Sequence, residues 1–378
     1  MAPITELPAL FAAFTLAAHL SSIALAGWRS LPPRRMPPPA HAPGVTLVRP
    51  MCGIDHDARR LLAASFTLDY PTLELLFCVE RADDAAIPLV REFIDAHPHV
   101  DARLLIGTDD LGDNPKLNNM AKAWRAARYE RICFTDSNLL VPSDYVQRLL
   151  AAWRDDETGC VSAPPVGGGA VGFGAEIECA FLNTFQARWQ FAVDTLGFGF
   201  AQGKTLFFDR RDLDRVGGIT ALAAEPAEDA AATKVVRALG KKVRLVDPPF
   251  VQPLGRRTLR SIWNRQVRWA RLRRATFPLL YLPELLTGSL APACATALAA
   301  WHQDLDITSS VASFLAIWYG AEAALTLVAR WQFTPWTPLA WLVRDLMVPG
   351  LWVAGLAGRS FVWRQAPVEN EATSGAHS

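Results

Sequence analysis

Acidic and amide side chains recur in this 378-residue chain at places where they could act on a charged substrate. They form three short clusters: Glu80 with Asp83 and Asp84, the turn Asp136-Ser137-Asn138, and the pair Glu228 and Asp229. Hard divalent cations take carboxylate and amide oxygens as ligands, so Asp136 and Asn138 are candidate metal ligands. A carboxylate at a helix start, such as Asp229, can also accept a proton as a general base. The clusters therefore predict chemistry on a diphosphate-bearing substrate that binds a cation.

A cluster of basic residues follows the acids. Eight arginines fall between Arg256 and Arg274, with no acidic residue among them. A helix that turns about 100° per residue would place four apolar side chains on one face, namely Leu259, Trp263, Val267 and Ala270. Arg265, Arg268 and Trp269 would lie on the opposite flank. Such a helix can lie on a membrane surface and direct guanidinium groups at a diphosphate. The simpler alternative is that these arginines are only the basic flank of the membrane segments that follow.

The elements that must position these residues follow an α/β pattern. Short apolar runs predict strands at 45–48, 73–79, 103–106 and 131–135. Amphipathic segments predict helices at 57–66, 85–96, 117–127 and 227–239. The run 197–208 resembles a buried strand and turn near a site, and the glycine-rich segment 167–174 is expected to be a flexible surface loop. Ligands bind at the carboxyl ends of strands in such sheets, which is where the first two acidic clusters fall.

Long apolar runs flank this region. The run 7–26 carries no charge and precedes Arg29, Arg34 and Arg35, so it is expected to span a membrane with the N-terminus outside. Three further stretches lie at 277–300, 311–328 and 336–357, and the first two are long enough to span. Arg344 and Asp345 interrupt the third stretch, which is therefore expected to be re-entrant or to pack against protein, with these two residues paired.

Six parts are expected along the chain. They are a transmembrane helix at 1–28, a proline-rich tether at 29–44, a cytosolic α/β domain at 45–254, an amphipathic interface helix at 255–275, membrane segments at 276–364 and a disordered tail at 365–378. The expected location is a bacterial inner membrane, with several spans and a cytoplasmic catalytic domain. A net charge of +1 predicts no nucleic-acid partner. The six single cysteines are expected to be reduced, and the histidine spacing predicts no zinc site.

The order of the motifs resembles one family. The matching stretches are Leu68-Asp69-Tyr70-Pro71, Val100-Asp101-Ala102-Arg103-Leu104, Asn114-Pro115-Lys116-Leu117-Asn118-Asn119, Ala227-Glu228-Asp229 and Arg265-Gln266-Val267-Arg268-Trp269. From about residue 45 to residue 363 the chain resembles the ceramide glucosyltransferases, which are inverting, membrane-bound enzymes of GT-A fold. The resemblance implies transfer of glucose from UDP-glucose to the primary hydroxyl of ceramide, a lipid acceptor in a membrane.

The resemblance also implies roles for single residues. Asp229 would be the general base, and Asp136 with Asn138 would hold a divalent metal ion, Mg2+ or Mn2+, and the donor diphosphate. The other donor-binding residues would be Asp84, Glu80, Lys116, Asn118, Arg265, Arg268 and Trp269. The implied partners are a UDP-sugar, a lipid acceptor and the membrane.

The chain departs from the family pattern in three places, the first being Gln186, in a region where eukaryotic members carry a histidine. Asp136-Ser137-Asn138 lacks the second acid that is frequent in related lipid glycosyltransferases, and Trp363-Arg364 precedes Gln365-Ala366-Pro367 rather than a basic segment with tyrosine. The donor and acceptor therefore stay open, with glucuronic acid, N-acetylglucosamine or galactose as other sugars and a hopanoid as another lipid. A processive polysaccharide synthase shares these motifs but needs more membrane helices. A silent membrane scaffold would not be expected to keep all three acids and both motif arginines.

Overall fold

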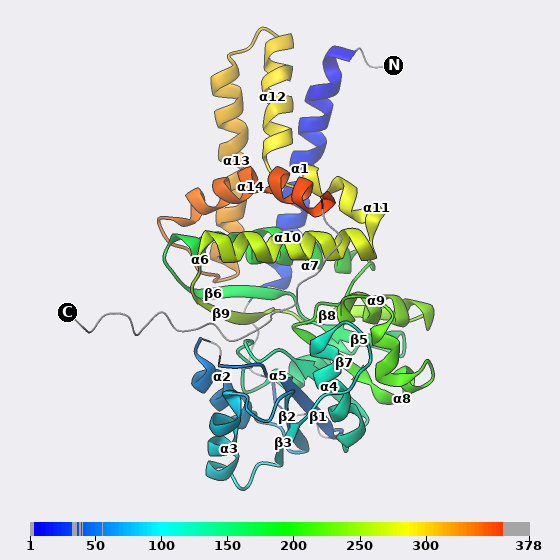
Figure 1. Cartoon of the computed structure of the whole chain (residues 1–378). Coiled ribbons are helices and arrows are strands. Elements are labelled where there is room, and N and C mark those ends of the chain that lie inside the picture. The colour runs from blue at the N-terminus through cyan, green and yellow to red at the C-terminus, as the bar shows by residue number, and fades with distance from the viewer. Residues whose placement is uncertain (1–3, 32–35, 38, 40, 55, 358–378) are drawn as a thin grey trace, which may run out of the picture.

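The computed structural model describes residues 4–31, 36–37, 39, 41–54 and 56–357. The expected tail 365–378, together with Arg34 and Arg35 of the tether, lies outside these residues. Figure 1 shows three layers: an α/β domain, a middle layer of helices beside a small sheet, and three helices that point away from the α/β domain. This arrangement places the α/β domain at one end of the molecule and the apolar helices at the other.

A seven-stranded sheet in the order β3-β2-β1-β4-β7-β5-β8 forms the α/β domain. Its strands are β1 Val45–Pro50, β2 Leu73–Val79, β3 Ala102–Ile106, β4 Arg131–Thr135, β5 Thr158–Ser162, β7 Thr205–Asp209 and β8 Lys242–Leu245. The strands β3, β2, β1 and β4 run parallel, whereas β7 is antiparallel to β4 and β5, and β8 is parallel to β5. The four strands expected from the apolar runs are confirmed as β1 to β4.

Helices cover both faces of this sheet. They are α2 Ala58–Phe66, α3 Ala86–Ala96, α4 Pro115–Ala126, α5 Tyr145–Ala152, α8 Arg210–Asp214 and α9 Glu228–Ala238. Leu75 and Phe77 of β2 pack in the core with α2, α3 and α5, whereas Leu76 and Cys78 pack with α4 and α9. Successive side chains of a strand point to opposite faces, so a mostly apolar strand is buried on both. These two cores fix the strand ends at which the acidic residues lie.

The glycine-rich segment 167–174, expected to be a flexible loop, lies largely in a strand. β6 (Pro165–Val171) pairs in parallel with β9 (Phe250–Arg256) in a separate two-stranded sheet. The Asn183 side chain accepts from Gly167 N at 2.7 Å and donates to Gly167 O at 3.1 Å. A Cβ at Gly167 would approach Leu254 Cδ1 at 2.9 Å and Cys179 Sγ at 3.0 Å. Glycine therefore permits close packing here, and the loop prediction is wrong.

The remaining helices form the other two layers. The middle layer contains α6 Phe173–Ala180, the π-helix η2 Phe181–Ala187, α7 Arg188–Thr195, α10 Leu259–Thr276 and α14 Thr337–Leu356. The outer group contains α1 Leu7–Arg29, α12 Leu290–His302 and α13 Ile307–Val328. By length and composition, three of the described helices could cross a membrane: α1, α13 and α14. Figure 1 shows α14 across the base of the outer group, beside α10, rather than parallel to α13.

The stretch 277–300, expected to be one spanning segment, is broken into three pieces. It contains α11 (Pro278–Tyr281), the 3-10 turn η4 (Leu282–Leu286) and α12, which has 13 residues. At 1.5 Å per residue α12 is only about 20 Å long, less than the ~30 Å of a bilayer core. Pro283 and Gly288 precede α12 and interrupt the helix. The stretch is therefore not one continuous spanning helix, and the exposed Leu279 and Leu280 of α11 suit contact with the lipid interface.

The expected pairing of Arg344 with Asp345 in α14 is confirmed. Arg344 Nε donates to Asp345 Oδ1 at 2.8 Å, and the Arg344 Nη atoms donate to both carboxylate oxygens of Glu322 in α13 at 2.9 Å. All three side chains are buried. Because a buried charge is costly without a partner, this cluster keeps α14 and α13 together.

Arg29, at the end of α1, joins the first apolar helix to the α/β domain. Its guanidinium donates to Asp194 Oδ2 at 2.6 Å, to Asp247 Oδ1 at 2.8 Å and to Leu245 O at 3.1 Å. Arg29 and Asp194 are both buried. In the sequence Arg29 is only a basic residue after an apolar run, whereas in the structure it is the residue that docks α1.

Replacing Arg29 with methionine is expected to lower the free energy of unfolding by about 3 kcal/mol, because it leaves Asp194 buried without its cation. Thermal unfolding in detergent would measure this loss. The matched control is Arg59→Met, which removes an exposed ion pair with Glu92 and should cost less than about 1 kcal/mol. Equal melting temperatures for the two variants would contradict the docking role of Arg29.

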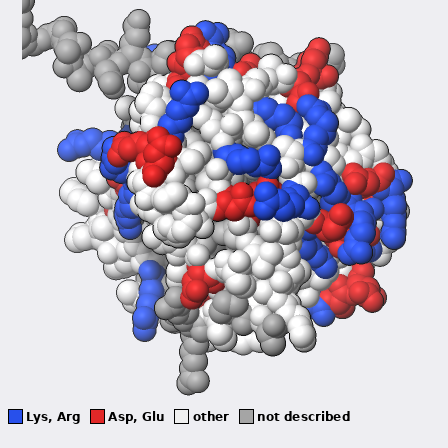
Figure 2. All heavy atoms as spheres, turned by 90° about the horizontal axis from the view of Figure 1, so that it is seen from below, with Lys and Arg blue, Asp and Glu red and all other residues white. Residues whose placement is uncertain are grey.

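The face of the α/β domain away from the apolar helices is charged. Figure 2 shows lysine and arginine side chains interspersed with aspartate and glutamate on this face. Mixed charges of both signs are typical of a surface that meets water. The opposite end of the molecule exposes large apolar side chains such as Trp301 and Leu305 between α12 and α13, which suits lipid.

Candidate active site

Asp136, which directly follows β4, is the centre of a charged cluster. Lys116 Nζ lies 2.6 Å from Asp136 Oδ1, and Lys204 Nζ lies 2.8 Å from Asp136 Oδ2. Lys204 also donates to Asn138 Oδ1 at 2.8 Å. Burial raises the pKa of Asp136, but the two ammonium groups outweigh this effect and hold the pKa well below its usual value. Asp136 is therefore an anion at neutral pH.

Lys116, in the first turn of α4, connects Asp136 to the start of α9. Its ammonium lies 2.7 Å from Glu228 Oε1 and donates to Gly203 O at 2.6 Å. Asn114 Nδ2 donates to the second oxygen of Glu228 at 2.8 Å. Burial lowers the pKa of Lys116, but Asp136 and Glu228 together raise it above its ordinary value. Lys116 is thus a fixed cation that orients two carboxylates.

Asp229 lies beside this cluster and is held mainly by backbone groups. Gly203 N donates to Asp229 Oδ2 at 2.9 Å, and Ala230 N donates to Asp229 Oδ1 at 2.8 Å. Burial, and next the negative charge of Glu228, raise the pKa of Asp229 to about 6. A Cβ at Gly203 would approach Glu228 Oε1 at 2.8 Å, so glycine allows this close approach. Asp229 has the near-neutral pKa that a general base needs.

The arginine-rich helix α10 borders the cluster. Arg265 Nη1 lies 2.6 Å from Oε1 of Glu178, a fully buried residue of α6. The positive charge of Arg265 also lowers the pKa of Lys204, so the guanidinium lies within electrostatic range of the Lys204 ammonium. Trp269 packs against Ala227 and Ala230 on either side of the Glu228-Asp229 pair. Arg268 lies between these two motif residues on the same helix.

The expected lipid face of α10 is partly covered by protein. Val267 packs in a core with Trp341 and Leu351 of α14, and Ala270 is buried. Leu259 is 56% exposed and Trp263 is 37% exposed, so only these two retain substantial exposed area. The interpretation that all four residues meet lipid is therefore wrong for Val267 and Ala270, because α14 lies over them.

Two of the expected donor-binding residues, Asp84 and Asn118, organise loops on the β2 and β3 side. Asp84 accepts hydrogen bonds from Gly53 N at 3.1 Å and from Ala86 N at 2.8 Å. Asn118 accepts from Leu111 N at 3.0 Å and donates to Gly112 O at 2.8 Å. Glu80 is exposed just after β2. The structure thus brings Lys116, Asp136, Asn138 and Asp229 together, with Arg265 in electrostatic range of Lys204, and places Asp84, Glu80 and Asn118 towards the β2 and β3 side.

Two residues of the cluster were not identified from the sequence. Lys204 is the one charged residue in the run 197–208. This single charge was the sequence feature that indicated a nearby site. β7 pairs with β4 in the register Thr135 with Thr205, and this register brings Lys204 beside Asp136. Glu178 gave no signal, because it lies in an apolar helix far along the chain from Arg265.

The profile of Glycosyl transferase family 21 matches residues 10–371. This chain belongs to glycosyl transferase family 21. Ceramide glucosyltransferase 1 of Caenorhabditis elegans is 28% identical over 336 residues, which cover 87% of this chain and 72% of that protein. The ceramide glucosyltransferase of Komagataella phaffii is 25% identical over 429 residues, which cover 88% of this chain and 84% of that protein.

A solved mannosyltransferase from Pyrobaculum calidifontis, in complex with GDP-Man and Mn2+, has a similar structure. The TM-score is 0.50 at 21% sequence identity, and the match covers 89% of this chain and 98% of that one. At this level of identity the likeness shows the fold alone. It confirms the expected GT-A type of α/β fold for this family 21 glycosyltransferase.

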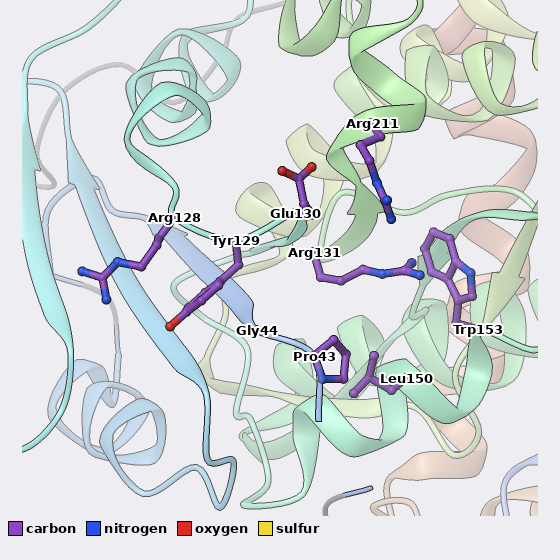
Figure 3. Close-up of a pocket in the computed structure, with 9 residues that line it drawn as sticks. All are labelled: Pro43, Gly44, Arg128, Tyr129, Glu130, Arg131, Leu150, Trp153 and Arg211. Carbon is purple, nitrogen blue, oxygen red and sulfur yellow. The ribbon is translucent and has the colours of Figure 1, made fainter. Parts of the chain in front are cut away.

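One cavity in this glycosyltransferase lies away from the cluster. It has a volume of about 530 Å3 and is lined by residues that include Gly44, Arg131, Trp153 and Arg211. Figure 3 shows Arg131 and Arg211 pointing towards Trp153, and the Arg131 guanidinium stacks on that indole at 4.0 Å. Gly44 precedes β1 and Arg131 begins β4, so the cavity is at the amino ends of the strands. Ligands of such sheets bind at the carboxyl ends of the strands, which is where Asp136 lies.

The oxygen donors near Asp136 suit a metal ion that the substrate helps to bind. Among the described residues, no three His, Cys, Asp or Glu side chains form a group that could hold a metal ion. Asp136 and Asn138 supply one carboxylate and one amide oxygen, both close to Lys204 Nζ. Mg2+ is often held by one or two carboxylates together with substrate phosphates and water. The residues therefore fit a cation shared with a diphosphate, and they do not form a complete cage.

The kcat/KM of this glycosyltransferase is expected to fall as the pH is lowered through about 6, because Asp229 must be deprotonated to accept a proton. It should be measured from about pH 5 to about pH 8, since kcat/KM reports the pKa of the free enzyme. Glu228→Gln is the informative control, since removing that charge should move the acidic limb to lower pH. A profile that stays flat down to about pH 5 would contradict Asp229 as the base.

Proposed function

We propose that this chain transfers glucose from UDP-glucose to the primary hydroxyl of ceramide with inversion at the anomeric carbon. The observation that carries the proposal is Asp229, a carboxylate with a near-neutral pKa, held by the same turn that places Lys204 on Asp136. The base and the cationic donor site are thus neighbours. The ceramide glucosyltransferases of Caenorhabditis elegans and Komagataella phaffii support the choice of sugar and lipid.

The donor half of the mechanism uses the cluster around Asp136. Asp136 and Asn138 would hold a divalent cation, Mg2+ or Mn2+, which when bound neutralises charge on the donor diphosphate. Lys204, Arg265 and Arg268 would face the diphosphate and stabilise the negative charge that develops as UDP leaves. Glu178 would fix the direction of Arg265 through their 2.6 Å contact. Asp84 and Glu80, towards β2, would contact the nucleotide, with Asn118 shaping the adjacent loop.

The acceptor half uses Asp229. Its carboxylate would take the proton from the ceramide hydroxyl while that oxygen bonds to the anomeric carbon and the bond from this carbon to the diphosphate oxygen breaks. Displacement from one side inverts the anomeric configuration and needs one base only. Trp269 would keep α10 against the start of α9, so that lipid arriving along α10 and α11 meets Asp229.

Product analysis tests this proposal. Purified full-length protein in nanodiscs would be incubated with UDP-glucose, UDP-glucuronic acid, UDP-N-acetylglucosamine or UDP-galactose, each with ceramide or a hopanoid. Mass spectrometry should find one hexose on ceramide from UDP-glucose. A different sugar or lipid in the main product would change the substrates and keep the chemistry, whereas repeated sugars would indicate a polymer synthase. No transfer from any donor would favour a scaffold.

We also propose that the α/β domain is cytoplasmic in a bacterial inner membrane, with α1 crossing it once and with η4–α12 and α13 crossing it as a hairpin. Cys160 is fully buried and cannot report on topology, whereas Cys52 is exposed on the loop after β1. In a Cys294→Ala background, a membrane-impermeant maleimide is expected to label Cys52 in inverted vesicles and to leave it unlabelled in intact cells. Labelling in intact cells would place the domain outside.

A further inference from the structure

Lys204 occupies the position between Asp136 and Asn138 that a metal ion would need. We propose that Lys204 holds this position while the donor site is empty, and moves onto the donor diphosphate when a divalent cation enters with it. The inference rests on the proposed function, since it requires a UDP-sugar as the ligand. It assigns to Lys204 a task that none of the sequence motifs indicates.

The contacts of Lys204 leave no room for a second cation. Its ammonium is 2.8 Å from Asp136 Oδ2 and 2.8 Å from Asn138 Oδ1, and only 14% of its side chain is exposed. A magnesium ion would need these oxygens at about 2.0–2.1 Å. The other oxygen of Asp136 already bonds Lys116 at 2.6 Å. A metal ion can therefore bind Asp136 and Asn138 only if Lys204 leaves.

Lys204 is held less firmly than Lys116. Lys116 contacts two carboxylates, Asp136 and Glu228, and the carbonyl of Gly203. Lys204 contacts only the shared carboxylate of Asp136 and a neutral amide, and it is repelled by Arg265 and Lys116. Burial is the main cause that lowers the pKa of Lys204, and Asp136 does not fully offset it. Lys204 is therefore the ammonium that a divalent cation would displace.

A diphosphate gives the displaced ammonium a new partner. The donor would carry its negative charges into the space next to Arg265, which already acts electrostatically on Lys204. A lysine side chain is a flexible stem with a compact charge, so it can turn from a carboxylate to a phosphate oxygen. Metal and donor binding should consequently be coupled: the metal binds weakly alone because Lys204 competes, and tightly once the diphosphate has taken Lys204.

Manganese binding to the full-length protein tests the inference. The signal of free Mn2+ in electron paramagnetic resonance would be titrated with protein in detergent, with and without UDP. We expect UDP to tighten Mn2+ binding by about 10-fold or more in the wild-type protein. Lys204→Met should bind Mn2+ without UDP about 10-fold more tightly than wild type and should bind UDP more weakly. Lys204→Arg keeps the cation and should behave like wild type.

Lys122→Met is the matched control, since Lys122 is part-buried but bonds Gly107 and Asn119 away from the cluster. It should leave Mn2+ binding unchanged. Equal Mn2+ affinity with and without UDP in the wild-type protein would overturn the inference. This wild-type titration tests the inference even if Lys204→Met fails to fold. Unchanged Mn2+ binding by folded Lys204→Met would also overturn it. If wild type still makes glucosylceramide in either case, the proposed function stands; if wild type binds no UDP and transfers no sugar, the proposed function fails.

Discussion

Asp229→Asn is expected to lower the turnover rate by about 10²-fold to 10⁴-fold while UDP-glucose binds with nearly unchanged affinity. The substitution keeps the size of the side chain and an oxygen that can accept from Gly203 N. It removes the ability to take a proton from the acceptor hydroxyl, together with one of the two oxygens that accept from Gly203 N and Ala230 N. The rate of glucosylceramide formation and the binding of UDP, measured separately by calorimetry, would show this division between chemistry and donor binding.

Glu228→Gln is the internal control for this prediction. Glu228 pairs with the Lys116 cation through one oxygen and accepts from Asn114 through the other, so it orients the cluster, whereas Asp229 accepts from the backbone N–H groups of Gly203 and Ala230. Replacing Glu228 should therefore reduce turnover less than Asp229→Asn. An equal or greater loss at Glu228, or a loss of UDP affinity in Asp229→Asn, would show that the base has been assigned to the wrong carboxylate.

The second large effect is expected at Asp136. Asp136→Asn should weaken UDP-glucose binding and lower turnover, with kcat/KM falling by about 10²-fold or more. The substitution removes the one carboxylate that both Lys116 and Lys204 contact, and it removes the only anionic ligand proposed for the metal ion. Steady-state kinetics at several donor concentrations, with and without added Mn2+, would separate the loss of affinity from the loss of rate.

Asp83→Asn provides the comparison for Asp136→Asn. Asp83 belongs to the first acidic cluster of the sequence, but its exposed side chain pairs with Arg81 at the surface. Its replacement should leave kcat/KM nearly unchanged. If Asp136→Asn retains full activity, and the wild-type protein also retains it in excess chelator, then neither Asp136 nor a metal ion takes part in the reaction.

The sequence was informative where local pattern and strand direction determine position. The apolar runs of β1 to β4 are bounded by polar residues, and because these strands are parallel, the residues after them meet at one edge of the sheet. From the position of Asp136 directly after the fourth strand, the sequence therefore predicts that it lies at the site. Asp229 could be placed by its position at the start of α9 and by the family resemblance.

The rest of the site depends on contacts between distant segments. Lys204 reaches Asp136 only because β7 returns antiparallel to β4, and an antiparallel return in a mostly parallel sheet could not be read from an apolar run. Glu178 reaches Arg265 through the packing of α6 against α10. The glycines of β6 gave a loop pattern because glycine serves both flexible turns and close packing, and composition does not distinguish them.

The anomeric configuration of the lipid product is the most direct test of the proposed single displacement. One base at Asp229 and a cationic donor site at Asp136 imply a single displacement, so UDP-glucose, an α-linked donor, should give a β-linked product. Proton NMR of the lipid formed by the purified wild-type protein from UDP-glucose and ceramide would measure this. We predict β-glucosylceramide alone; α-linked glucosylceramide, or no glycosylated ceramide from a folded protein that binds UDP, would contradict the account.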